Sequence, residues 1–289
     1  MSGSARWKWS LWSCALALSF VTPSSDSATG SPFRVRIHQD HQASMTSDDV
    51  KAEVSVGRDI AARILGRLPL ADQPELTRYI NLVGTGVALN ASRAELSYHF
   101  ALLDSDEVNA YSTPGGYIFI TRGALALMHD EAELAGVLAH EIAHITERHI
   151  VKELNLHAAE SSTVAGLGRL LGGATDTSRV AFFQAVDKAV TILFERGFKQ
   201  QDELAADRVA TLLLANTGYD PLALQRFLVR TEMLLNERST AAHTITHPPT
   251  AQRHHHLEQL LKSEQLTAVD FITAKSRFQH YVTTLNSPK

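Results

Sequence analysis

The stretch VLAHEIAHITERH, residues 137–149, places His140 and His144 four positions apart with Glu141 beside the first histidine. On an α-helix, residues four apart differ by about 40° in direction and by about 6 Å along the axis, so the two imidazoles face one point. Glu141 projects from the same half of the helix, where its carboxylate can reach a water without binding a metal. In such an H-E-x-x-H arrangement the histidines bind zinc and the glutamate acts as general base. The alternative is a pair of core histidines whose nitrogens are satisfied by hydrogen bonds.

A third ligand would separate these interpretations, because catalytic zinc takes three protein ligands and keeps one position open. The segment QDELAADRVA, residues 201–210, offers Glu203 and, one helical turn later, Asp207. It follows the motif at a distance that permits a helical hairpin, so we expect Glu203 to complete a site for one zinc ion (Zn2+) per chain. Asp207 could then accept a hydrogen bond from the outer nitrogen of a zinc-bound histidine. A solvated pair of helical carboxylates is the plainer alternative.

The elements that must hold these residues are mostly helical, because apolar side chains recur at three- and four-residue spacing. The predicted helices cover residues 48–68, 74–89, 130–154 and 200–217, with another starting at Pro221 and two short ones after Pro249. The helix that carries the motif is apolar on more than one side, so we expect it to be central and buried. His149 follows His144 by five positions on this helix, so we expect it to face away from the zinc pair and to be a packing or polar-surface residue.

Strands are predicted between the second helix and the motif. Residues 95–104 alternate in polarity, and residues 108–121 contain a Pro-Gly-Gly turn followed by the β-rich sequence YIFIT. We expect one small sheet, so the predicted fold class is α+β, mainly α. Residues 158–198 are looser and glycine-interrupted; they could cover a cleft, make a peripheral membrane contact or form an ordinary helical hairpin. The apolar residues that suggest this are Phe182, Phe183, Leu193 and Phe194.

Composition limits the possible partners. At 289 residues and 44% hydrophobic content the chain can bury a substantial core. A net charge of −4 with interspersed signs offers no basic stripe for a phosphate backbone, so we expect no nucleic-acid partner.

The first residues have the layout of an export signal. Arg6 and Lys8 precede the apolar run Leu11–Val21, and a small, polar segment follows. The run is shorter than the roughly 20 residues of a membrane span, although an uncleaved anchor is an alternative. We therefore expect an exported protein, periplasmic or associated with the cell envelope. Cys14 is the only cysteine, so a lipoprotein is the second alternative, and the mature chain would contain no disulfide.

Four motifs together resemble one protein family. NAYSTPGGYIFITRGAL, HEIAH, DELAAD and THPPTAQR occur in this order and resemble those of the HtpX/BepA/LoiP-type zinc metallopeptidases, relatives of the Ste-type prenyl-protein proteases. The resemblance covers roughly residues 50–260 and implies a zincin-like metalloprotease fold. It also implies the zinc ligands His140, His144 and Glu203, the base Glu141 and the supporting residue Asp207.

The implied reaction is peptide hydrolysis, in which Glu141 takes the proton of a zinc-activated water and passes it to the leaving amine. The negative tetrahedral oxygen needs a second donor, and His247 and Arg253 are the catalytic candidates. Pro248 restricts His247 to extended backbone, so its ring could project into a cleft. A further hypothesis is that His247 occupies the fourth zinc position and holds the enzyme idle. A proline-stiffened surface loop is the plainer interpretation.

Substrate binding is expected along the strand YIFIT. If this strand is the sheet edge beside the motif helix, Tyr117 and Ile118 would pair with an extended peptide through backbone hydrogen bonds. Asn109 and Ala110 match the segment that lines the cleft in the family. We therefore expect unfolded or extended polypeptides as substrates, and the resemblance implies that these are misfolded or misassembled cell-envelope proteins. A chaperone-like protein with little proteolysis and a purely structural zinc site are the alternatives.

These inferences divide the chain into four parts, and the third carries every candidate site residue. The parts are an export signal at 1–28, a flexible N-terminal segment at 29–47, a zinc metalloprotease domain at 48–265 and a C-terminal helical tail at 266–289.

Overall fold

The computed structural model describes residues 47–154, 176–238, 247, 250–266 and 270–283. All of them fall within one unit, Ser31–Lys289. The expected export signal with Cys14, nearly all of the expected flexible segment and the glycine-rich part of residues 158–198 lie outside the described residues.

Helices make up most of the described chain. They are α2 (Ser47–Arg67), α3 (Pro74–Ala88), α4 (Arg122–Leu127), α5 (Glu131–Thr146), α6 (His149–Glu153), α8 (Asp176–Thr191), the π-helix η1 (Ile192–Arg196), α9 (Gln200–Thr217), α10 (Ala223–Arg238), α11 (Ala251–Ser263) and α12 (Lys275–Val282). The helices predicted over 48–68, 74–89 and 200–217 are confirmed as α2, α3 and α9. None of the described helices is both long enough and apolar enough to span a lipid bilayer.

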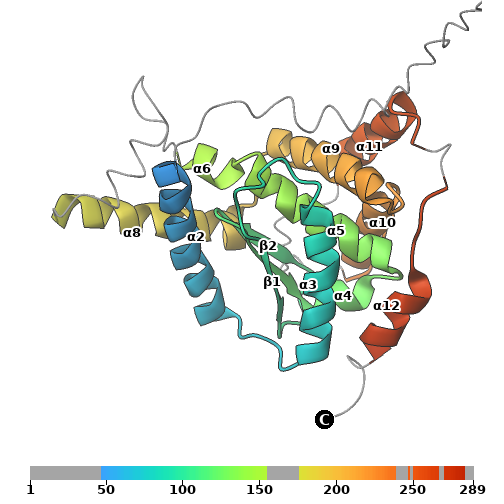
Figure 1. Cartoon of the computed structure of the whole chain (residues 1–289), viewed down its shortest axis with the longest axis horizontal. Helices are drawn as coiled ribbons and strands as arrows, with labels where there is room; N and C mark the ends of the chain where they lie inside the picture. The colour runs from blue at the N-terminus through green and yellow to red at the C-terminus, as the bar shows by residue number, and fades with distance from the viewer. Residues whose placement is uncertain (1–46, 155–175, 239–246, 248–249, 267–269, 284–289) are drawn as a thin grey trace, which may run out of the picture. The chain divides into compact units, whose positions relative to one another are not determined.

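Helix α5 carries the H-E-x-x-H motif and is central, as predicted. Every one of its residues is buried. Asp130 caps its N-terminus by accepting a hydrogen bond from the Glu133 N–H at 3.0 Å. Acidic residues in the first turn also stabilise the helix, because they lie at the positive end of its macrodipole. α5 packs against α3, α9 and α10 and against one edge of the sheet (Figure 1). The motif is thus held by elements on several sides.

The predicted continuous helix over 130–154 is broken. α5 ends at Thr146, and Arg148 adopts left-handed backbone, with φ 58° and ψ 37°, before α6 begins. This conformation is costly for a residue that has a side chain. An ion pair opposes that cost, because Arg148 Nε lies 3.3 Å from Oε2 of the buried Glu53 on α2. The break redirects the chain immediately after the motif.

The predicted small sheet is confirmed. Its strands are β1 (His99–Leu103), β2 (Ala110–Thr113) and β3 (Tyr117–Thr121), in the order β1-β3-β2. β3 pairs parallel with β1 and antiparallel with β2. The expectation that YIFIT forms the edge is therefore wrong, because β3 has a strand on each side. The edge that contacts α5 most is β2.

Two glycines let backbones approach each other around the motif. A Cβ added to Gly57 of α2 would lie 1.5 Å from the carbonyl oxygen of Pro114, so α2 lies directly against the β2–β3 turn. Thr113 at the end of β2 donates a hydrogen bond to the Gly57 carbonyl at 3.0 Å. A Cβ on Gly136 of α5 would lie 3.1 Å from the backbone nitrogen of Leu224. α10 therefore runs close against the motif helix.

Helix α12 packs on the same core as the motif helix. Phe278 is buried, and Arg277 forms an ion pair with the buried Glu131 at the first position of α5. The same carboxylate accepts hydrogen bonds from Tyr79 at 2.7 Å and from Tyr219 at 2.5 Å. The expected C-terminal tail therefore contains a helix that anchors the start of α5.

Candidate metal centre

The two motif histidines and Glu203 of α9 converge between their helices. The Nε2 atoms of His140 and His144 lie 3.1 Å apart. Glu203 places one carboxylate oxygen 3.4 Å from the first of these nitrogens and the other 3.6 Å from the second. A tetrahedral zinc ion with bonds of about 2.1 Å separates its ligand atoms by roughly 3.4 Å. The donor set and its spacing therefore fit one zinc ion.

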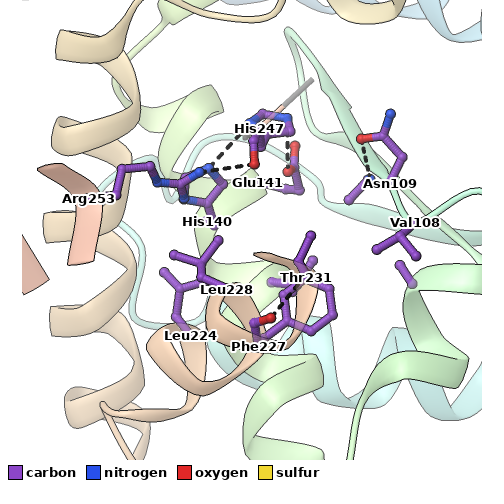
Figure 2. A pocket seen from close by; sticks show the side chains of 13 residues that line it. Val108, Asn109, His140, Glu141, Leu224, Phe227, Leu228, Thr231, His247 and Arg253 are labelled. Carbon is purple, nitrogen blue, oxygen red and sulfur yellow. Dashed lines mark hydrogen bonds and ion pairs between the residues drawn. The ribbon is translucent and has the colours of Figure 1, made fainter. Parts of the chain in front are cut away.

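His247 reaches the same point from a different segment. Its Nδ1 atom lies 2.8 Å from Glu203 Oε1 and 3.4 Å from His140 Nε2. One ligand atom from each of these residues and from His144 falls within 4.8 Å of all the others. Figure 2 shows His247 next to His140 and Glu141. The structure thus places this ring at the site, as the sequence predicts, and not on an isolated surface loop.

Glu141 stands beside the ligand cluster and not inside it. Its Oε1 lies 3.5 Å from Nε2 of His247. Its Oε2 is buried and has no hydrogen-bond partner among the described residues. A buried carboxylate oxygen is costly unless water, substrate or an ion meets it. The side chain lines a pocket (Figure 2), where it could meet a reacting water.

The outer face of His140 is surrounded by charge. Its Nδ1 lies 3.1 Å from Oδ1 of Asp207, and a hydrogen bond from this nitrogen to that aspartate stays a prediction. Burial lowers the pKa of His140, but the carboxylates of Asp207 and Glu203 outweigh it and raise that pKa to about 9. Burial also raises the pKa of Asp207, and the guanidinium of Arg253 outweighs it, so this pKa lies below its ordinary value. A metal ion at His140 would therefore compete with a proton for this ring.

Arg253 is 1% exposed and faces carboxylates. Its Nε and Nη2 donate to Asp207 at 2.8 and 2.6 Å, and Nη1 lies 2.9 Å from Glu203 Oε2. Nη1 also donates to the backbone carbonyl of His247 at 3.2 Å. An oxyanion donor must instead aim an N–H at the substrate. These contacts favour a positioning role, and the predicted role as oxyanion donor stays a prediction.

The surroundings of His144 are different, and sequence analysis missed both partners. His149 is buried, and its Nδ1 lies 2.9 Å from Nδ1 of His144. The expectation that it faces away is wrong because α5 breaks at Arg148. Phe198 stacks on the His144 ring with centroids 4.1 Å apart, and Gly197 turns the chain there at φ 67°. Burial holds the pKa of His144 well below its ordinary value and lowers that of His149 to about 3, so both rings are neutral.

A mostly apolar pocket opens beside Glu141 (Figure 2). Its open space, including the mouth, is about 450 Å³. Asn109 and Ala110 line it, as the resemblance implies, whereas Tyr117 and Ile118 do not, because they lie on the middle strand. Beneath the carboxylate the walls come from α5 and α10. The apolar lining consists of Val108, Ala110, Ala124, Val137, Leu224, Phe227 and Leu228.

The apolar residues between 176 and 198 pack mainly inside the protein. Leu193 is fully buried, and Phe194 stacks on Tyr111 of β2 with ring centroids 4.9 Å apart. Phe182 is part of the same cluster, while Phe183 is 49% exposed. Packing explains most of these side chains, and a peripheral membrane contact stays a prediction.

Comparison with known proteins agrees with this site. The chain is 30% identical over 236 residues to the Beta-barrel assembly-enhancing protease of Escherichia coli (strain K12), covering 78% of this chain and 48% of that protein. The protein of the same name from Yersinia pestis is 31% identical over 183 residues, 62% of this chain and 37% of its own. Mitochondrial metalloendopeptidase OMA1 of Schizosaccharomyces pombe is 26% identical over 191 residues, 66% of this chain and 54% of its own.

The chain spans about half the length of the curated relatives that it matches. A match to the description Peptidase family M48 covers residues 74–261. That span is more than half of the 289 residues and includes the motif, Glu203 and His247. The chain therefore belongs to Peptidase family M48.

Proposed function

We propose that the protein is a zinc-dependent endopeptidase that hydrolyses peptide bonds of misfolded or misassembled cell-envelope proteins. The observation that supports this most directly is the convergence of His140, His144 and Glu203 with Glu141 beside them. Relatives named Beta-barrel assembly-enhancing protease support an envelope substrate. The expected export signal supports action in the periplasm or at the cell envelope.

The site residues divide the chemistry between them. A zinc ion held by the two histidines and Glu203 would polarise the peptide carbonyl and lower the pKa of a water. Glu141 takes the proton of the attacking water and passes it to the leaving amine. His247, whose Nε2 has no hydrogen-bond partner among the described residues, is the nearest candidate to donate to the developing oxyanion.

An extended polypeptide is the substrate form that suits the cleft. β2 has no strand on its outer side among the described residues, so it can pair with a peptide by backbone hydrogen bonds. The pocket beside Glu141 then takes the side chain of a residue next to the cleaved bond. Its wall of Leu224, Phe227 and Leu228 favours an apolar side chain, because a charged one would lose its hydration there without gaining a partner.

His247 also supports an idle state. With its Nδ1 2.8 Å from Glu203 and 3.4 Å from His140, it is placed to fill the fourth ligand position when no substrate is bound. The same contacts favour the alternative of a purely structural site with four protein ligands. His247→Ala separates them: a plug gives an active or more active variant that keeps zinc, and a structural ligand gives loss of zinc and stability. An inactive variant with unchanged zinc content and fold would instead favour a catalytic role for His247.

The function is tested by metal analysis together with casein digestion, comparing the parent protein with Glu141→Gln. We expect one zinc ion per chain in both proteins, and cleavage that a chelator abolishes in the parent and that the variant lacks. A zinc-loaded, folded parent that cleaves nothing would favour the chaperone-like alternative. Cleavage that survives in Glu141→Gln would contradict the assigned base.

A further inference from the structure

We propose that His149 is a positioning residue for the zinc ligand His144, and that the left-handed turn at Arg148 brings it into place. This inference rests on the proposed zinc site. It concerns how one ligand is oriented and not how the peptide is cut.

The contacts of His144 fix where its proton must lie. Its Nε2 faces His140 and Glu203, at 3.1 and 3.6 Å, so this nitrogen is the metal-binding atom and carries no proton. A neutral imidazole then has its proton on Nδ1. That N–H points at Nδ1 of His149, 2.9 Å away. His144 therefore donates, and His149 accepts.

The same logic continues one residue further. If Nδ1 of His149 accepts, its proton lies on Nε2, which is 3.8 Å from Oδ1 of Asp202. This distance is too long for a direct hydrogen bond. A bridging water, or a small movement of the Asp202 carboxylate, would complete the contact. The chain from His144 through His149 to Asp202 thus assigns one tautomer to each ring. Partners of this kind orient zinc ligands in metal sites generally.

A continuous helix could not make this contact. Five residues correspond to about 500° of helical rotation, so residue 149 would point about 140° away from residue 144. Arg148 removes the problem by leaving the helix at φ 58°. Its guanidinium contacts Glu53, a carboxylate that also lies 3.0 Å from Nη1 of the buried Arg93. Residues with a strained backbone conformation that is held by surrounding contacts, here a buried ion-pair network, are found most often at functional sites.

The face of the His144 ring is confined as well. Phe198 lies against it, 29° from parallel. Phe198 limits tilting of the ring, whereas His149 limits rotation in the ring plane by fixing Nδ1. The two residues therefore act on different motions of one ligand.

The competing interpretation is that His149 merely fills space, and two substitutions distinguish it. His149→Leu keeps an apolar body but has no acceptor, whereas His149→Asn keeps a polar group close to the position of Nδ1. A positioning role predicts that zinc affinity falls about 10- to 100-fold in His149→Leu and recovers at least partly in His149→Asn. A space-filling role predicts the reverse order, because Asn would bury an unsatisfied amide. Competition with a fluorescent chelator measures the affinity, and Ile150→Val, in the same short helix, is the matched control.

The role of the left-handed turn at Arg148 is tested by a matched pair of substitutions. Arg148→Gly and Arg148→Val both remove the guanidinium, but only glycine accepts left-handed backbone without strain. We expect Arg148→Gly to keep zinc affinity within a few-fold of the parent and Arg148→Val to lose at least tenfold. Equal losses in the two variants would overturn the role assigned to the turn.

A spectrum of the unmodified protein decides the tautomers without any variant. In the zinc-loaded protein, ¹⁵N-edited NMR of the imidazoles should show His144 protonated at Nδ1 and His149 protonated at Nε2. A proton on Nδ1 of His149 would overturn the inference. Failure of the proposed function looks different: the parent would bind no zinc, whereas failure of this inference leaves a zinc-binding parent whose affinity is unchanged in His149→Leu.

Discussion

His140 and His144 lie one turn apart on α5, yet their outer nitrogens meet opposite kinds of partner. His140 faces Asp207, which the buried Arg253 anchors through two hydrogen bonds. His144 faces the neutral ring of His149 and lies under Phe198. A carboxylate partner makes an imidazole a more basic ligand, whereas a neutral partner orients it without adding charge. The comparison indicates that a charged partner positions His140, whereas a neutral ring and an aromatic neighbour position His144, the two candidate ligands of one metal ion.

The largest effect is expected on the charged side. Asp207→Ala removes the acceptor of His140 and leaves Arg253 buried with fewer anions, so unfolding should become about 3 to 5 kcal/mol easier. Zinc affinity should fall about 100-fold. Urea unfolding and chelator competition measure the two quantities. Asp202→Ala on the same helix is the matched control on the His144 side, and an equal loss there would remove the contrast between the two histidines.

The next largest effect tests the role of Arg253. Arg253→Met leaves Asp207 and Glu203 without their cation, so we expect a stability loss of about 3 kcal/mol and about tenfold weaker zinc binding. The double variant Arg253→Met/Asp207→Leu should recover part of the stability, because it removes the uncompensated charge as well. If Arg253 acts only as an oxyanion donor, stability and zinc affinity stay at the parent level and only kcat falls.

A smaller effect is expected at Phe198, which stacks on the ring of His144. Phe198→Ala removes the ring that stacks on His144, which corresponds to about 1 kcal/mol, or roughly fivefold in zinc affinity. Phe198→Leu keeps much of the apolar volume without the stacked ring, so its loss should be intermediate. Isothermal titration with zinc gives both values. A loss as large as that of Asp207→Ala would show that the two sides contribute alike.

The smallest effect on the site is expected at the far end of α5. Glu131→Gln should leave zinc affinity unchanged while lowering stability by about 1 to 3 kcal/mol. Burial raises the pKa of Glu131, but Arg277, Tyr219 and Tyr79 outweigh it and lower this pKa below its ordinary value near 4.5. The stabilisation is therefore complete above about pH 4.5 and is lost as the pH falls through the lower, folded-state pKa. Urea unfolding between pH 3 and 7 should show a steeper acid loss in the parent than in the variant.

Much of this site follows from local periodicity alone. The motif spacing and the apolar pattern predicted a buried helix with two convergent imidazoles, and the ELAAD spacing predicted that Glu203 and Asp207 share a face. Those predictions depend only on helix geometry. The contact of His149 could not be predicted in this way, because it depends on a helix break at Arg148 that no proline or glycine marks. Nor could strand order be predicted, since a run such as YIFIT fits a middle strand as well as an edge.

The close contact at Gly57 has a consequence for how the proposed protease would admit substrate. Because α2 rests on the β2–β3 turn with no room for a methyl group, this turn cannot move toward α2 unless that helix moves with it. The position of β2, which lines the pocket through Ala110, is thus limited by a helix that contributes no residue to the pocket lining. Peptide binding that shifts β2 and its turn toward α2 would be visible as faster amide exchange in α2, remote in sequence from every candidate metal ligand.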